Sequence, residues 1–477
     1  MEIDNVGDDF FANLELPPAA AFPVKSATAA IGDTTIQTAL QSNLKSKFDY
    51  GKEIEKQLSE PIKLRRASLG YRASLGLLSI FMMSMPLAYA AFVGLTAWLV
   101  YYYTFNIVPD VAQETGIRGG RAMIIMWMAL ITPIIVGVIV VVFMCKPIFF
   151  SLVDFSPSRT RTLTRTGEPL LFELVDRICE TIRAPKPVRI EVDSQVNASA
   201  SYGAGLKGIF KSELVLRIGT PLVAGLSVRQ LAGILAHEFG HFSQGAGMRA
   251  QLIIGAINAW FAKVVFARDA VDELLDDAIE DSESLFVFVL LLARGCVGLV
   301  RWILWGFMVA AYTASSAFSR QMEFDADRYE LALVGSDVFI STGEELHRLG
   351  YANEKSMQAL AELMQKAVLI DNIPKMIQVC RNKMTADELC MIHQAMMVAK
   401  TGLLDTHPCT RQRNEAATRI AESGVFTIDR PARELIRHYD ALCVNVTNDF
   451  YRNVIGRLVD PGELQPVDSH LHVLFRS

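Results

Sequence analysis

A chain of 477 residues with 51% hydrophobic residues and a mean hydropathy of +0.28 is more apolar than an ordinary soluble protein, which indicates a lipid bilayer as a partner. The formal net charge of -5, with basic residues grouped beside apolar runs, gives no electrostatic reason to expect nucleic-acid binding. The seven cysteines are odd in number, widely spaced and form no Cys-x-x-Cys pair, which suits free thiols in a reducing compartment.

The first part of the chain is expected to hold a tail and a membrane hairpin. Residues 1–58 are rich in Ala, Thr, Ser and Asp, so we expect residues 1–66 to form a flexible or partly helical cytoplasmic tail. Two uncharged apolar runs follow, at 73–109 and 122–145, and each exceeds the roughly 20 residues that a helix needs to cross a bilayer. Residues 67–150 are therefore predicted to form a transmembrane hairpin.

Basic residues lie outside this hairpin rather than in its connecting loop. Lys63, Arg65, Arg66 and Arg72 precede it, Lys146, Arg159, Arg161 and Arg165 follow it, and the loop contains only Arg118 and Arg121. By the positive-inside tendency, both ends of the hairpin face the cytoplasm. We therefore expect a multi-pass protein of the inner (cytoplasmic) membrane.

A small sheet and a capped helix are predicted next. Residues 187–192 alternate apolar and polar, and residues 212–218 form a second β-like stretch. Ser227 and Gln230 then form a capping-box pattern in front of an apolar-periodic segment, which predicts the start of a helix.

That helix carries His237-Glu238-Phe239-Gly240-His241. Two histidines four residues apart lie on one face of a helix, where both imidazoles can reach a single metal ion. Glu238, beside the first histidine, can face a metal-bound water as a general base. The pattern predicts zinc-dependent hydrolysis.

Two further apolar stretches, 252–267 and 285–319, flank an acidic segment and predict an apolar hairpin inserted at about 251–319. Lys263 interrupts the first stretch, which could equally form a membrane-surface or core helix. Arg294 and Arg301 interrupt the second and could snorkel or face a polar interior.

Zinc in a hydrolase typically takes three protein ligands, so the two histidines require a third donor. Glu323 and Asp327 share a helix face directly after the last apolar stretch. Glu323 is the expected third ligand, and Asp327 the expected hydrogen-bond acceptor for the other ring nitrogen of a ligand histidine. The alternative is a solvated acidic helix face.

With these motifs, residues 170–420 resemble the membrane gluzincin metallopeptidases, the group of HtpX-like heat-shock proteases and CaaX prenyl proteases. The resemblance also includes His407-Pro408 followed by Arg413. It implies that His407 and Arg413 lie at the rim of the site and bond the oxyanion or the substrate backbone. Alternatively, His407-Pro408 marks a helix N-terminus and Arg413 pairs with Glu415 or another carboxylate.

The resemblance also covers a short segment expected to bind substrate. Asn197, Ala198, Ser199 and Ala200 are similar to the family's Asn-Ala-Phe-Ala segment, with Ser199 in place of the phenylalanine. In the family this segment looks like an edge strand onto which an extended peptide adds. The substitution leaves the details of the substrate pocket open.

The expected fold is mainly α with a small β-sheet: multi-pass membrane helices plus a zincin-type α+β catalytic domain. Residues 151–427 would form the peptidase domain and 428–477 a C-terminal extension. The expected function is a membrane-anchored endopeptidase with one Zn²⁺ per chain, acting on membrane or misfolded proteins at the cytoplasmic face. The alternatives are a processing protease of a lipidated or terminal sequence and a non-catalytic zinc-binding scaffold; the oligomeric state is left open.

Overall fold

The structure, a computed structural model, describes residues 50–62, 69–114, 120–150, 160–202, 213–243, 246–266, 276–280, 284–457 and 459–475. It is mainly helical with a small sheet, as predicted. The chain divides into two compact units. Unit 1 comprises Met1–Arg66, Pro157–Met248 and Arg320–Ser477, and unit 2 comprises Ala67–Ser156 and Arg249–Ser319. Residues 1–49 and 63–66 of the expected tail lie outside the described residues.

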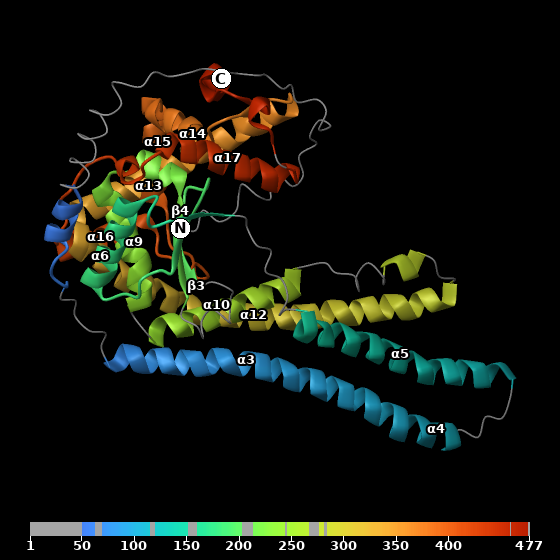
Figure 1. The fold of residues 1–477 in the computed structure, drawn as a ribbon. Coiled ribbons are helices and arrows are strands. Elements are labelled where there is room, and N and C mark those ends of the chain that lie inside the picture. Colours follow the sequence, from blue (N-terminus) through green and yellow to red (C-terminus); the bar gives the residue numbers. More distant parts are fainter. Residues whose placement is uncertain are drawn as a thin grey trace. The chain divides into compact units, whose positions relative to one another are not determined.

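Unit 2 contains the predicted membrane hairpin. Helix α3 (Leu69–Tyr102) continues through a π-helical turn (Tyr103–Ile107) into α4 (Val108–Glu114), and α5 (Gly120–Phe150) returns beside α3 (Figure 1). The Tyr89 hydroxyl donates to the Met144 carbonyl across this pair. Gly76–Glu114 and Gly120–Cys145 are both long and apolar enough to cross a bilayer.

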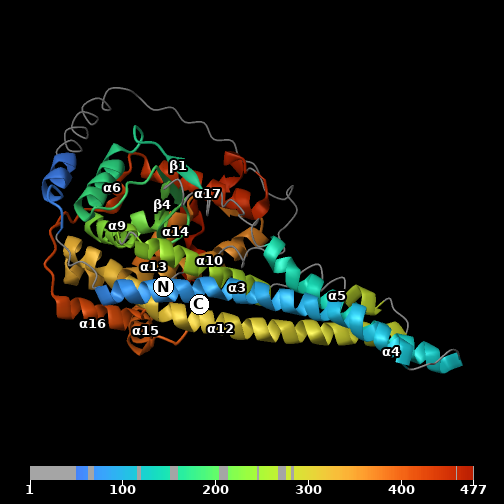
Figure 2. The same cartoon turned by 90° about the horizontal axis from the view of Figure 1, so that it is seen from below.

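The second pair of apolar helices is unequal. Figure 1 shows α10 (Ala246–Phe266) beside α12 (Ser284–Val334), Figure 2 gives the same helices from below, and Asn258 Nδ2 donates to Ser315 Oγ over 2.8 Å. The segment Val287–Val334 of α12 is a third candidate span. Among the residues whose side chains the structure describes, the apolar run of α10 is Ile253–Ala262.

Large apolar side chains are exposed along the helices of unit 2. Leu77, Ile125 and Trp302 are between 66% and 70% exposed. Exposing such large apolar surfaces to water is unfavourable. Such extensive apolar exposure indicates a lipid-facing surface.

Unit 1 holds a mixed four-stranded sheet in the order β1-β2-β4-β3. Its strands are β1 (Arg161–Leu163), β2 (Arg189–Asp193), β3 (Ala198–Tyr202) and β4 (Leu214–Gly219). β2 and β4 are parallel and correspond to the two predicted strands; β1 and β3 are antiparallel to their neighbours. β3 lies at one edge, as the family resemblance implies.

The helices of unit 1 surround two apolar cores. They are α6 (Pro169–Ile182), α8 (Thr220–Gly225), α9 (Val228–Ser243), α13 (Ser336–Gln365), α14 (Ile373–Asn382), α15 (Ala386–Val398), α16 (Thr410–Ile420) and α17 (Tyr439–Ile455). In the first core, Ile178 of α6 and Leu235 of α9 pack with Leu216 of the sheet. In the second, α13 and α14 pack with α17 and the residues after it.

Two segments expected to lie outside the peptidase domain contribute to these cores. Residues 50–57 are helical, and Tyr50, Ile54 and Leu58, spaced four apart, are buried in the first core. This helical part of the expected tail thus packs through its apolar stripe into the same core as α6. Towards the C-terminus, β6 (Leu464–Gln465) pairs with β5 (Leu369–Ile370), and Tyr451 is fully buried.

Candidate metal centre

The helix that carries the two histidines begins where the sequence predicts. Gln230 N donates to Ser227 Oγ over 3.3 Å, and Ser227 N donates to Gln230 Oε1 over 3.1 Å. These reciprocal bonds satisfy backbone N–H groups that have no partner within the helix. The capping box is confirmed, and α9 places His237 and His241 on consecutive turns of one face.

Two glycines of α9 let the helix approach α12 closely. A Cβ at Gly240 would lie 2.9 Å from Tyr329 Cδ2, and one at Gly233 would lie 3.0 Å from Glu330 Oε1 and from Val334 Cγ2. Real Cβ atoms essentially never show the distance at Gly240, and the distances at Gly233 are tighter than nine in ten real Cβ contacts. Because Gly233 and Gly240 lie on one helix face, the two backbones can meet over two turns.

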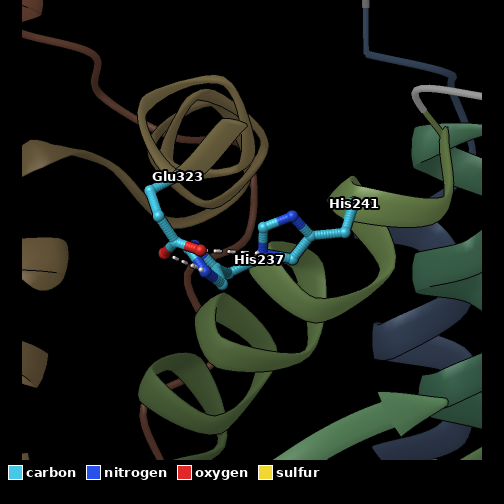
Figure 3. A group of neighbouring side chains, drawn as sticks. All are labelled: His237, His241 and Glu323. Atoms are coloured by element: carbon cyan, nitrogen blue, oxygen red, sulfur yellow. Dashed lines mark ion pairs between the residues drawn. The ribbon is translucent and has the colours of Figure 1, made fainter. Parts of the chain in front are cut away.

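This approach brings His237, His241 and Glu323 together, as Figure 3 shows. His237 Nε2 lies 3.4 Å from Glu323 Oε2, and His241 Nε2 lies 3.6 Å from Glu323 Oε1. In a tetrahedral zinc site with bonds of about 2.1 Å, two ligand atoms lie about 3.4 Å apart. The donor types and their separations therefore fit a zinc ion.

A second carboxylate lies beside the other ring nitrogen of His237. Asp327 Oδ1 lies 3.0 Å from His237 Nδ1, and both side chains are buried. Burial alone would lower the pKa of His237, but hydrogen bonds with Asp327 and Glu323 outweigh it and raise the pKa to about 10. The same carboxylate field stabilises any cation bound at this place.

Glu238 lies beside the cluster and points towards the sheet. Its Oε2 accepts a hydrogen bond of 3.4 Å from the backbone N–H of Ala200 in β3. Burial raises the pKa of Glu238 above its ordinary value, and the charge of His237 partly opposes this rise. A carboxylate with a raised pKa is a better proton acceptor near neutral pH than an exposed one.

His407 and Arg413 reach the site from the loop before α16 and from α16 itself. His407 Nδ1 lies 3.2 Å from Glu323 Oε2. Arg413 is hydrogen-bonded to Asp327 through Nε and Nη2. It thus forms an ion pair with a carboxylate, which was the second interpretation of this arginine, and the carboxylate is that of Asp327. Glu415 pairs instead with Arg411.

Glu330 is a further acidic residue of the site that was not predicted from the sequence; it is buried, with its Oε2 4.0 Å from His237 Nδ1. Glu323, Asp327 and Glu330 follow one another at intervals of four and three residues, which places all three on one face of α12. This spacing was a signal that could have identified Glu330.

Residues 168–421 match the family model described as Peptidase family M48. The chain belongs to this family. The match covers more than half of the sequence and includes every residue of the cluster described above.

Curated relatives agree with the family match. Protease HtpX of Haemophilus influenzae (strain PittEE) is 29% identical over 249 residues, which is 51% of this chain and 81% of the relative. Protease HtpX of Psychrobacter sp. (strain PRwf-1) is 30% identical over 37% of this chain and 53% of the relative. No solved structure matches. The chain is thus an HtpX-like membrane metallopeptidase, with peptides or proteins as substrates.

Proposed function

We propose that the protein is a zinc-dependent endopeptidase in which His237, His241 and Glu323 hold one Zn²⁺ per chain and Glu238 is the general base. The observation that carries this proposal is the convergence of two imidazole nitrogens and one carboxylate at the separations of a tetrahedral site, beside a carboxylate that is not part of the ligand set. A non-catalytic scaffold has no use for Glu238 at this position.

Zinc bound here would supply Lewis acidity, which lowers the pKa of water towards neutrality and polarises the scissile carbonyl group. Glu238 accepts a proton from the attacking water and later delivers it to the leaving amine. Asp327 holds the His237 ring through Nδ1, so that Nε2 faces the metal site. His407, beside Glu323, donates from its second ring nitrogen to the oxyanion.

The edge strand β3 binds the substrate in this proposal. Gly219 N donates to Asn197 O, and bonding pairs alternate along an antiparallel ladder, so the backbone groups of Ala198 and Ala200 point away from β4. The Ala200 N–H faces Glu238. A peptide added along Asn197, Ala198, Ser199 and Ala200 would therefore present its backbone to the general base.

Membrane or misfolded proteins at the cytoplasmic face are the proposed substrates. Arg320 follows an uncharged stretch of α12, 302–319, and Glu323 lies less than one further turn along the same helix. The metal site is thus close along the chain to a membrane-spanning segment, and the distribution of Lys and Arg around the first hairpin favours the cytoplasmic side. Cleavage restricted to freely soluble proteins would contradict this part of the proposal.

The decisive experiment compares wild-type protein with Glu238→Gln, both purified in detergent. We expect equal zinc content and a loss of cleavage of an unfolded protein by a factor on the order of 10² to 10⁴. Glu362→Gln, on an exposed position of α13, is the matched control and should leave both quantities unchanged. Undiminished proteolysis by Glu238→Gln would rule out the mechanism.

A further inference from the structure

An apolar surface segment leads into the loop that carries His407. It comprises residues 389–398 of α15 (Ala386–Val398) and the following residues 399–404, and we call it the 389–404 segment. Its exposed apolar side chains are Leu389 (37%), Met391 (49%), Met397 (54%), Val398 (73%), Leu403 (69%) and Leu404 (46%). Six exposed apolar side chains therefore lie within sixteen consecutive residues, and this clustering distinguishes the segment from single exposed apolar residues elsewhere in the unit.

The outward face of α15 lacks the charges that a solvated helix carries. Ile392 and Met396, one turn apart, are buried, and α15 contacts α13. The acidic residues Asp387 and Glu388 lie in the first turn, and no charged residue follows them as far as Val398. The outward face holds the polar residues His393 and Gln394, but its other exposed side chains include Leu389, Met391, Met397 and Val398. A solvated surface helix normally carries several charges opposite its buried stripe, so this mostly apolar face suits contact with the boundary of an apolar phase.

A contact with α12 relates the segment to the membrane. Arg320 Nη1 donates to the carbonyl oxygen of Asp405 over 2.7 Å and to that of Leu403 over 3.5 Å. Arg320 is also the first charged residue after the uncharged stretch 302–319 of α12. An arginine at the end of an apolar span lies at the level of the lipid headgroups. The carbonyl groups of this loop are therefore held at that level.

From these observations we propose that the 389–404 segment binds the lipid bilayer, with Leu403, Leu404 and the outward side chains of α15 in the boundary between headgroups and acyl chains. Lys400, the one cationic residue of the segment, is exposed and suits an anionic headgroup. The same loop carries His407 beside Glu323, so lipid contact also restrains the loop that completes one side of the metal centre.

Photo-crosslinking in vesicles tests this proposal without reference to catalysis. The full chain, carrying Glu238→Gln to prevent self-cleavage, is reconstituted into vesicles of phosphatidylethanolamine and phosphatidylglycerol, with p-benzoylphenylalanine in place of Leu403 or Leu404. The matched controls place the probe at Val188 (60% exposed) and Val425 (49% exposed), which lie in the same unit. Irradiation is followed by mass spectrometry of the probe-bearing peptides.

We expect phospholipid adducts at positions 403 and 404 and none at positions 188 and 425. A probe at Val398 should also form lipid adducts, and the double change Leu403→Glu and Leu404→Glu should abolish them while leaving the melting temperature unchanged, because both leucines are exposed. Equal lipid adducts at all positions, adducts only with a second copy of the chain, or no lipid adducts at 403 and 404 would each overturn the proposal. None of these outcomes depends on whether the protein cleaves peptides.

Discussion

Arg413 of α16 binds the carboxylate of Asp327 on α12 through two hydrogen bonds, with Nε 3.0 Å from Oδ2. The side chain of Asp327 is 4% exposed and that of Arg413 is 23% exposed. Asp327 in turn lies against Nδ1 of His237. Arg413 is thus a positioning residue that fixes Asp327, which fixes the ring of a proposed zinc ligand.

Arg413→Lys should weaken zinc binding by about 10- to 100-fold, the range typical for partners of metal-ligating histidines. Lysine keeps the positive charge but cannot form the paired hydrogen bonds of the guanidinium group. Competition with a chelator of known affinity measures the change. Arg411→Lys, which alters an exposed ion pair with Glu415 on the same helix, is the control and should leave zinc affinity unchanged. Equal affinity in both variants would contradict this role of Arg413.

Substitutions of two acidic residues of α12 should differ in their effect on the zinc content of the purified protein. Glu323→Gln removes the negative charge next to Nε2 of both histidines and should release zinc during purification. Glu330→Gln should retain zinc, because Glu330 approaches only Nδ1 of His237, at 4.0 Å. Metal content determined by mass spectrometry distinguishes the two. Retention by Glu323→Gln together with loss by Glu330→Gln would instead favour a site made of His237, Asp327 and Glu330.

Gly240→Ala should separate α9 from α12. The new methyl group would lie 2.9 Å from the ring of Tyr329, so one helix must shift, with an expected loss of about 1–3 kcal/mol of stability. Zinc content and thermal unfolding report the change. Gly343→Ala, in α13, is the control, because its methyl group would make ordinary van der Waals contacts, with Thr410 Cγ2 at 3.6 Å and Asn414 Oδ1 at 4.0 Å. A Gly240→Ala protein with normal zinc content and melting temperature would show that close helix contact is not required.

The N-terminus of α15 provides a prediction about pH. The pKa of Glu388 is lowered to about 2 by its hydrogen bonds with Lys355 and with the backbone of Thr385. Because the folded pKa lies below the ordinary value of 4.5, this carboxylate stabilises the fold above pH 4.5, and the contribution is lost as the pH falls towards 2. Glu388→Gln should cost about 1 kcal/mol at pH 7.

Thermal unfolding in detergent at several pH values tests this dependence. The difference in melting temperature between wild type and Glu388→Gln should shrink as the pH falls below 4.5, whereas Glu362→Gln should show no difference at any pH. A constant difference for Glu388→Gln across this range would mean that its charge is not responsible.

Short-range patterns in the sequence were sufficient to predict several structural features of this protein. The capping box of Ser227 and Gln230, the shared helix face of His237 and His241, and the long uncharged runs of the first hairpin depend on residues within a few turns of one another. Helix start signals, helical periodicity and membrane-spanning length are local properties, so the sequence alone determines them.

Only the tertiary structure decided which distant residues meet. Arg413 could pair with any nearby carboxylate, and packing of α16 against α13 selects Asp327 rather than Glu415. The close approach of α9 and α12 depends on Gly233 and Gly240, whose need for space becomes visible only when the partner helix is in place. Contacts between segments far apart in the chain depend on the packing of the whole unit, and no local pattern encodes that packing.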